Sequence, residues 1–239
     1  MKLDILVLCA HPDDAELGCA GTLASHIAKG HKVGIVDLTR GELGTRGTAE
    51  DRDREAAESA KILGVHAREN LGLKDGFFQN TKEDQLKVIQ AIRKYQPSIV
   101  LTNAVQDRHP DHGKGAHLTY DSCFLSGLIK IETFDEKGNK QAAWRPGAVY
   151  HFIQSQFIKP DFVVDISNYW EIKMKAIMAF KTQFYNPDSK EPETYISSPE
   201  FLRMVESRAT ELGHAIGVKH GEGFTVSRYP GVRSLFDLI

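Results

Sequence analysis

Short apolar runs alternate with amphipathic stretches through the first half of the chain. The run from Leu3 to Ala10 is hydrophobic except for Asp4, which is typical of a strand buried on both faces. The stretches between such runs carry apolar residues at helical spacing, and Gly30 and Gly64 are typical helix stop signals. Strands are expected at residues 3–10, 33–38, 66–71 and 98–103, and helices at 17–29, 50–63, 82–95 and 110–128.

This β-α alternation predicts an α/β fold: a Rossmann-like, mostly parallel sheet with helices on both faces. The second half is less regular, and its polar stretch at 133–145 predicts an exposed turn or hairpin. Further strands are expected at 149–156 and 162–166, helices at 168–181 and 199–216, and a loop at 186–199. We expect a single domain over residues 1–239, with a core of about 1–130 and a C-terminal part, about 131–239, that caps the active-site end.

Composition narrows the function classes. Hydrophobic residues make up 41% of the 239 residues, so a sizeable core can form, and a net charge of -2 argues against a nucleic-acid partner. No apolar window approaches the ~18 residues of a membrane span, and the N-terminus has no secretory pattern. The three cysteines form no CxxC pair. We therefore expect reduced, mostly buried cysteines in a cytoplasmic protein.

Ionisable side chains gather directly after two of the predicted strands. Residues 10–16 read Ala-His-Pro-Asp-Asp-Ala-Glu, and residues 107–112 read Asp-Arg-His-Pro-Asp-His. Ligands of open α/β sheets bind beyond the carboxyl ends of the strands, where both clusters are expected. Such clusters are costly in a core and useful at a site. The sequence therefore predicts one metal site assembled across the sheet.

We expect His11, Asp14 and His112 to bind one divalent cation. Two imidazoles and a carboxylate suit zinc, with one position left for water. Pro110 at the first helical position would place His109 at the N-cap and His112 one turn further, so that the two can converge. Spacing also allows Asp13 instead of Asp14, or His109 instead of His112. Alone, such an Asp would more often be a helix cap and such a His a surface residue.

The same two motifs resemble the LmbE-like, or PIG-L, family of zinc-dependent N-acetylglucosamine deacetylases. The resemblance extends to residues 37–44, to Arg52 with Glu55-Ala56, and to 63–65. Towards the C-terminus, residues 159–167 and 221–224 resemble the bacillithiol-biosynthesis branch, which removes acetyl from N-acetylglucosaminyl-malate. Inositol- or oligosaccharide-linked N-acetylglucosamine remains the alternative substrate.

The resemblance implies a role for each matching residue. His11, Asp14 and His112 would bind zinc, although iron or cobalt would also suit such a site. Asp13 would be the general base, a protonated His109 would stabilise the oxyanion, and Asp111 would orient His109. Arg52 and Arg108, beside the family motifs, are candidates for the malate carboxylates.

The resemblance also bears on assembly and on the distal contacts. Family members are often trimers or hexamers, so a homo-oligomer is expected, with no membrane and no nucleic-acid partner. The glycine-rich loop Gly41–Gly47 would either approach the sugar or serve as a mobile connection. Phe201 stands where close relatives carry Tyr, so the missing hydroxyl would have to come from elsewhere, with Tyr195 as the candidate.

Three other function classes fit less well. A nucleotide-binding Rossmann protein would need a Gly-x-Gly-x-x-Gly loop where this chain has His-Pro-Asp-Asp. His109-x-Asp111 imitates part of the ligand triad of a non-haem iron oxygenase, but the β-α alternation argues against that scaffold. A non-catalytic metal-binding module would have no spare base, whereas Asp13 and His109 are left over here.

Overall fold

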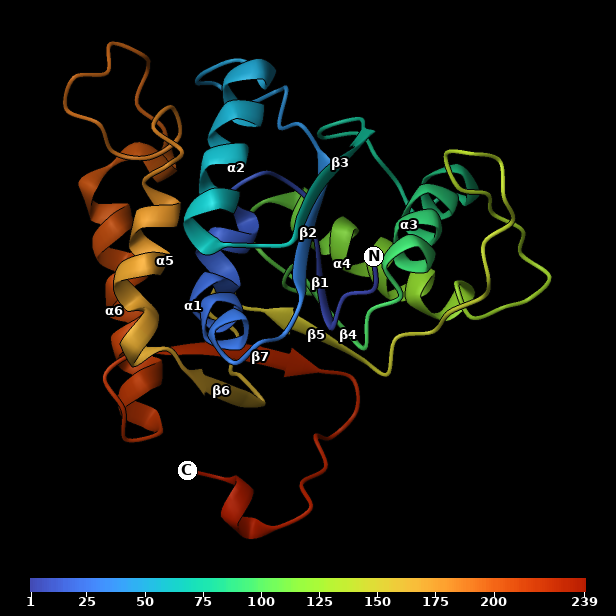
Figure 1. Cartoon of the computed structure of the whole chain (residues 1–239). Coiled ribbons are helices and arrows are strands. Elements are labelled where there is room, and N and C mark those ends of the chain that lie inside the picture. Colours follow the sequence, from blue (N-terminus) through green and yellow to red (C-terminus); the bar gives the residue numbers. More distant parts are fainter.

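The computed structural model describes all 239 residues and contains one seven-stranded sheet in the order β3-β2-β1-β4-β5-β7-β6 (Figure 1). The strands are β1 (Ile5–Cys9), β2 (Val33–Thr39), β3 (Ala67–Leu73), β4 (Ile99–Thr102), β5 (Ala148–Phe152), β6 (Phe162–Asp165) and β7 (Gly221–Val226). The helices are α1 (Asp14–Ala28), α2 (Ala49–Leu63), α3 (Lys82–Tyr95), α4 (Pro110–Leu125), α5 (Trp170–Ile177) and α6 (Pro199–Ala215). Short 3₁₀ helices lie at Ser167–Tyr169 (η1), Tyr195–Ser197 (η2) and Leu235–Asp237 (η3).

Strands β1 to β5 are parallel, and β7 is antiparallel to both of its neighbours. This confirms the predicted mostly parallel α/β sheet. Strand β1 pairs with β2 on one side and with β4 on the other, so the direction of winding reverses between β1 and β4. Ligands of open α/β sheets bind at this switch point, and both ionisable clusters follow these two strands.

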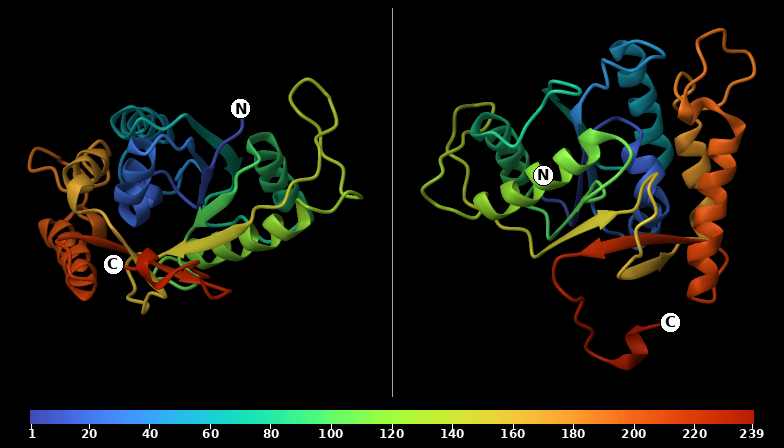
Figure 2. Two further views of the ribbon diagram at one scale, coloured as in Figure 1. Left: turned by 60° about the horizontal axis from the view of Figure 1, so that its bottom comes forward. Right: turned by 180° about the vertical axis from the view of Figure 1, so that it is seen from behind.

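Helices cover both faces of the sheet, as predicted (Figures 1 and 2). Alternate residues of β1 point to opposite faces. Leu6 and Leu8 pack with residues of α3 and α4, whereas Val7 and Cys9 pack with residues of α1 and α5. A third cluster joins α2, α5 and α6 and includes Phe184. The C-terminal part therefore extends the sheet through β5 to β7 and also adds helices beside α1 and α2.

Several boundaries differ from the predicted ones. Helix α1 begins at Asp14, three residues earlier than expected, and the helix expected at 168–181 is divided into η1 and α5. The stretch 133–145 is the predicted turn, with one isolated bridge between Phe134 and Lys140. Strand β7 was not predicted, because Gly221 and Gly223 weaken a strand pattern.

The remaining expectations about the chain can be compared directly with the structure. None of its helices combines the length and the apolar character needed to cross a bilayer. Cys9, Cys19 and Cys123 are buried and form no disulfide, as expected. After β7 the chain leaves the body of the molecule (Figure 2), and Phe236 near its end is exposed.

Candidate active site

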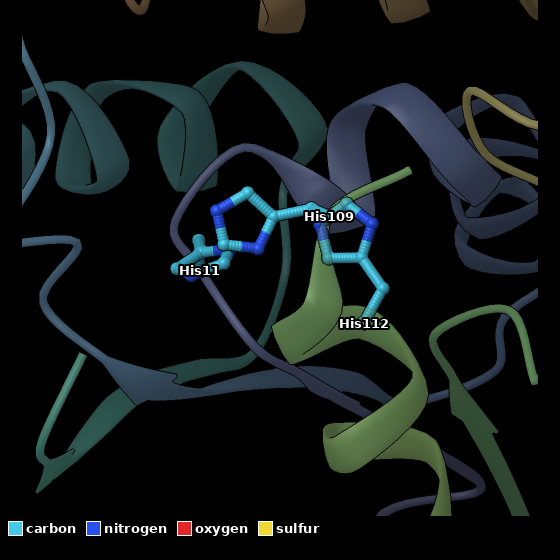
Figure 3. A group of neighbouring side chains, drawn as sticks. All are labelled: His11, His109 and His112. Carbon is cyan, nitrogen blue, oxygen red and sulfur yellow. The ribbon is translucent and has the colours of Figure 1, made fainter. Parts of the chain in front are cut away.

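Three imidazoles from distant parts of the sequence meet at the carboxyl edge of the sheet. His11 follows β1, whereas His109 and His112 belong to the beginning of α4 (Figure 3). The ring centroid of His11 lies 4.8 Å from that of His109 and 5.6 Å from that of His112, and the latter two are 5.2 Å apart. The two predicted clusters are therefore one site.

The first turn of α4 has the predicted form. Pro110 is the first helical residue and His109 is the N-cap, whose Nδ1 accepts a hydrogen bond from the backbone N–H of Asp111 at 3.3 Å. Burial, together with the charges of His11 and His112, lowers the pKa of His109. An imidazole whose Nδ1 accepts a hydrogen bond is neutral and carries its proton on Nε2. The lowered pKa favours the neutral form of His109, with Nε2 as its donor, whereas the expected role requires the protonated form.

Asp14 lies between two of the imidazoles. Its carboxylate oxygens are 3.5 Å from Nδ1 of His11 and 3.1 Å from Nε2 of His112. Oδ2 also accepts hydrogen bonds from the His11 N–H and Asn103 Nδ2, and Oδ1 accepts one from Gln154 Nε2. Burial would raise the pKa of Asp14, but His112 and His11 hold it well below its usual range. Asp14 is thus an ionised, fixed acceptor.

The outer nitrogen of His11 is held by carboxylates. Its Nε2 lies 3.0 Å from Oδ1 of Asp75 and 3.5 Å from Oδ2 of Asp111. Burial disfavours the imidazolium form, but Asp111, Asp14 and Asp75 outweigh it and raise the pKa of His11 well above its usual value. The ring is therefore oriented with Nδ1 towards Asp14.

His112 is held in the same manner from the opposite side. Its Nδ1 lies 2.6 Å from Oδ2 of Asp107, so its Nε2 faces Asp14. Burial would lower the pKa of His112, but Asp14 and Asp107 raise it to about 9. Protein histidines that bind metals are commonly oriented by a carboxylate on their second nitrogen. His11 and His112 both have that arrangement.

The donor set fits a divalent cation. Two groups have donor atoms within 4.8 Å of one another: His11 with His109 and His112, and His11 with Asp75 and Asp111. Nε2 of His11 faces the carboxylate of Asp75, so Nδ1 is the nitrogen that faces Asp14. The other carboxylate oxygen of Asp14 faces Nε2 of His112. A cation among these inward donors would also compensate a buried excess of carboxylates. Asp14 belongs to neither of the two groups, and the ligand set His11, Asp14 and His112 stays a prediction.

Asp13 has a different environment from Asp14. Its backbone φ of 108° lies in the left-handed region, which is uncommon for a residue other than glycine and costs about 1–3 kcal/mol. Its side chain makes no helix-capping hydrogen bond. Instead Oδ2 accepts a hydrogen bond of 3.0 Å from Arg52 Nη2, while Oδ1 has no hydrogen bond within the chain. Burial raises the pKa of Asp13 to about 7, although the Arg52 charge opposes it.

Arg52 is occupied within the protein. Its buried guanidinium also donates to the carbonyl of Pro12 and to Oε1 of Gln183. Gly41, with a φ of 64°, packs directly on this guanidinium, and a Cβ there would lie 2.7 Å from Cζ. The Gly41–Gly47 loop is thus anchored on Arg52. Arg52 thus contacts the expected base and also lines the cavity, and its predicted contact with the substrate stays a prediction.

Asp111 differs from the expectation that it orients His109. Its Oδ2 faces His11 and accepts the Gly76 N–H at 2.7 Å, and its Oδ1 pairs with Lys114 at 2.9 Å. Only its backbone N–H reaches His109. Because Asp111 is the second residue of α4, its side chain points back towards the β1 loop, and its carboxylate supports the His11 ring instead.

Three contributors to the site were not foreseen. Asp75, Asn103 and Gln154 contact either His11 or Asp14, and each follows directly after a parallel strand or close to its end. Asn103 and Gln154 lie within the strands predicted at 98–103 and 149–156, which end earlier in the structure, and Asp75 follows the strand predicted at 66–71, so the signal for all three is a polar residue near a strand end.

The site opens into a cavity of about 560 Å³. At its outer end the exposed Arg108 guanidinium lies 4.3 Å from the ring centre of Tyr195, which in turn contacts Phe201 edge-on. Phe201 itself is buried, and Tyr195 is half-exposed beside it. Arg108 makes no hydrogen bond or ion pair within the chain, so it is available to a bound molecule.

A sheet of this topology, with His and Asp donors and a spare carboxylate at its switch point, is typical of α/β enzymes that bind their ligand at the carboxyl edge of the sheet. The PIG-L family model, described as GlcNAc-PI de-N-acetylase, matches residues 6–123. A diacetylchitobiose deacetylase from Thermococcus kodakarensis is 30% identical over 95% of this chain and 84% of the relative. The chain belongs to the PIG-L family of deacetylases.

Two further similarities concern the branch and the fold. A probable N-acetyl-α-D-glucosaminyl L-malate deacetylase 2 from Bacillus subtilis is 28% identical over 77% of this chain and 84% of the relative. The crystal structure of the conserved protein TT1542 from Thermus thermophilus superimposes with a TM-score of 0.86, at 33% identity and over 98% of each chain.

Proposed function

We propose that this protein hydrolyses the N-acetyl group of an N-acetylglucosamine conjugate and depends on a zinc ion held by His11, Asp14 and His112. The observation that carries the proposal is the position of Asp13, whose Oδ1 is unbonded beside this donor set. A purely structural metal site is closed and has no use for a spare base. The family membership supports the same reaction.

A zinc ion would supply polarisation of the acyl oxygen and a lower pKa of water. The chain's own residues handle the proton and the charge. As water adds to the acyl carbon, Asp13 Oδ1 accepts its proton, while Arg52 keeps Oδ2 in place. Asp13 then passes the proton to the amide nitrogen, the C–N bond breaks, and acetate and the free amine leave. Positioned proton transfer of this kind contributes ~10²–10⁴-fold in rate.

His109 stabilises the charge that develops on the acyl oxygen. Because its Nδ1 is engaged by the Asp111 N–H, the proton on Nε2 is the one directed at a ligand. Nε2 makes no hydrogen bond within the chain. A preorganised neutral donor of this kind is an oxyanion-hole group, worth about 10²–10³-fold. The proposed role of Asp111 is to orient His11.

For the aglycone we propose malate, as in bacillithiol biosynthesis. Arg108 is an unpaired guanidinium at the outer end of the cavity, and a planar guanidinium suits a carboxylate. The B. subtilis relative supports this choice, whereas the T. kodakarensis relative favours an oligosaccharide-linked substrate as the second candidate. Arg52 is proposed to act only through Asp13.

The test compares amine release from a panel of N-acetylglucosaminides that differ only in the aglycone: malate, methyl, inositol and a second glucosamine. We expect kcat/KM to be highest for the malate conjugate, to vanish after chelation and to return with zinc. Release of amine that survives complete metal removal would contradict the metal-dependent mechanism. A preference for the chitobiose conjugate would replace malate and leave the hydrolysis intact.

A further inference from the structure

One stripe of α6 lines the cavity well beyond the reacting groups. The cavity-facing residues of this helix recur at helical spacing from Phe201 to Leu212. At 1.5 Å per residue they cover about 16 Å of wall. Between them lie Val205 and Ala209, both buried and apolar. An acetyl group would fill only a small part of a wall of this length.

The opposite wall begins directly below the carboxylates. Leu17 and Gly18 lie one turn of α1 after Asp13 and Asp14, and both line the cavity. Gly18 must be glycine, because a Cβ there would lie 2.1 Å from the Phe152 ring. Further in, the wall is formed by Ile153 and by the strand residues Gly221–Gly223. We call the region between Val205–Leu212 of α6 and Leu17, Ile153 and Gly221–Gly223 the inner part of the cavity. It begins at the point at which the acyl carbon would react.

The charged groups of this inner part all make hydrogen bonds within the protein. Lys173 Nζ donates to Glu222 at 2.6 Å and to the Leu17 carbonyl at 2.7 Å. Glu222 also accepts hydrogen bonds from two backbone N–H groups of α1. The Arg208 guanidinium donates to the carbonyls of Gln154 and Ser155. Much of the hydrogen-bonding capacity of these groups is used within the protein, so a sugar hydroxyl placed here would find few partners, whereas an alkyl chain needs none.

The outer part has the opposite character. Arg108 is unpaired there, and Tyr195 makes no hydrogen bond through its hydroxyl. A substrate with a polar sugar and an apolar acyl chain can therefore bind in one orientation only. Its sugar would lie towards Arg108, and its acyl chain would extend along α6.

We propose that the inner part is an acyl-chain site and that the enzyme also removes medium-length N-acyl groups, of about four to eight carbons, from glucosamine conjugates. This inference rests on the proposed function, because the same step is used: water adds to the acyl carbon and the C–N bond breaks. The products are the corresponding carboxylic acid and the free amine. No oxidant, reductant or second substrate is required.

The first experiment measures kcat/KM for acetyl, butanoyl, hexanoyl and octanoyl amides of one glucosamine conjugate. Each buried methylene is worth up to roughly fourfold. We expect the hexanoyl amide to equal or exceed the acetyl amide. A hexanoyl value below the acetyl value would overturn the proposal.

Substitutions that shorten the site provide the second experiment. Ala209→Leu and Val205→Phe each add volume to the apolar stripe, at two different depths. We expect either change to lower the ratio of hexanoyl to acetyl kcat/KM at least tenfold. Thr210→Leu adds similar bulk on the exposed side of the same helix and should leave the ratio unchanged. An unaltered ratio in both folded inner variants, checked by their melting curves, would refute the site.

Binding to the metal-free protein separates this inference from the proposed function. Calorimetry with acetate and hexanoate requires no turnover, and we expect hexanoate to bind at least tenfold more tightly. Ala209→Leu should abolish that preference. If no amide is hydrolysed but hexanoate still binds more tightly, the proposed function fails and the site stands. If acetyl amides are hydrolysed and hexanoate shows no preference, the acyl-chain site fails alone.

Discussion

Two buried groups of charges in this protein are built differently. The Lys173–Glu222 pair beside α1 contains one charge of each sign, and both side chains are almost fully buried. The cluster at the sheet edge contains five carboxylates, those of Asp13, Asp14, Asp75, Asp107 and Asp111, but only Arg52 and Lys114 as permanent cations beside them.

The difference separates a structural pair from a site. Lys173 and Glu222 bond to the Leu17 carbonyl and the Gly21 N–H, which are i, i+4 partners in a regular α-helix, so the pair ties α5 and β7 to α1. Its two charges are balanced within the protein. The sheet-edge cluster has more carboxylates than permanent cations. The excess negative charge raises the pKa values of His11 and His112. A divalent cation would balance that excess directly.

Removal of an inward imidazole should have the largest effect. His112→Ala leaves two expected ligands, and we expect it to lose the metal and at least about 10⁴-fold in kcat/KM, because a metal ion supplies several kcal/mol to such a reaction. Metal content by mass spectrometry and amine release measure the two losses. His117→Ala, an exposed histidine on the same helix, is the matched control. Full metal occupancy in His112→Ala would remove this residue from the ligand set.

Replacing the spare carboxylate of Asp13 should lower turnover but leave metal binding unchanged. Asp13→Asn keeps the shape of the side chain but cannot take up a proton, so kcat should fall ~10²–10⁴-fold with metal content unchanged. Asp14→Asn should instead reduce metal content. The pair of variants tests whether these adjacent residues divide base and ligand roles. If both lost metal equally, the division would be wrong.

The balanced pair should affect stability and leave the chemistry intact. Lys173→Met leaves Glu222 buried without its cation, which we expect to destabilise the fold by about 3–5 kcal/mol. The double variant Lys173→Met with Glu222→Gln should recover part of that loss. Thermal unfolding measures both, with Lys175→Met on the exposed side of α5 as control. A single variant as stable as the control would show that the pair contributes little.

These two regions also differ in how well the sequence predicts them. The metal cluster is local in the chain: its candidate ligands and base lie in residues 11–14 and 109–112, directly after strands with clear apolar patterns. A parallel sheet places the carboxyl ends of its strands at one edge. The β-α alternation alone therefore predicts that the two motifs lie close together. Asp75 was missed because it stands alone after β3, without a neighbouring His to draw attention to it.

The Lys173–Glu222 pair could not be predicted, because its partners are 49 residues apart and on elements with weak patterns. Glu222 lies on β7, whose two glycines conceal the strand. Gly223 packs closely on β5 and its surroundings, since a Cβ there would lie 3.0 Å from Cδ1 of Ile153. The contacts of Arg52 could not be predicted for a similar reason. An arginine near a motif reveals its charge, but only the packing of Gly41 and Asp13 around it shows that the charge is already used.

The smallest effect is expected at the outer end of the cavity, where a charge is neither balanced nor buried. Arg108→Met should raise KM for the malate conjugate roughly tenfold, near the lower end of the 1.5–3 kcal/mol for a hydrogen bond to a charged group, because Arg108 is exposed. KM for the methyl glycoside should stay the same, since that substrate has no carboxylate. Arg145→Met removes an arginine stacked in the same way on Phe124, outside the cavity, and serves as control. Equal increases in KM for both substrates would show that Arg108 holds the sugar or Tyr195 in place and does not select the malate carboxylates. An increase confined to the malate conjugate would show that an arginine left unpaired by the protein binds the charge of the substrate.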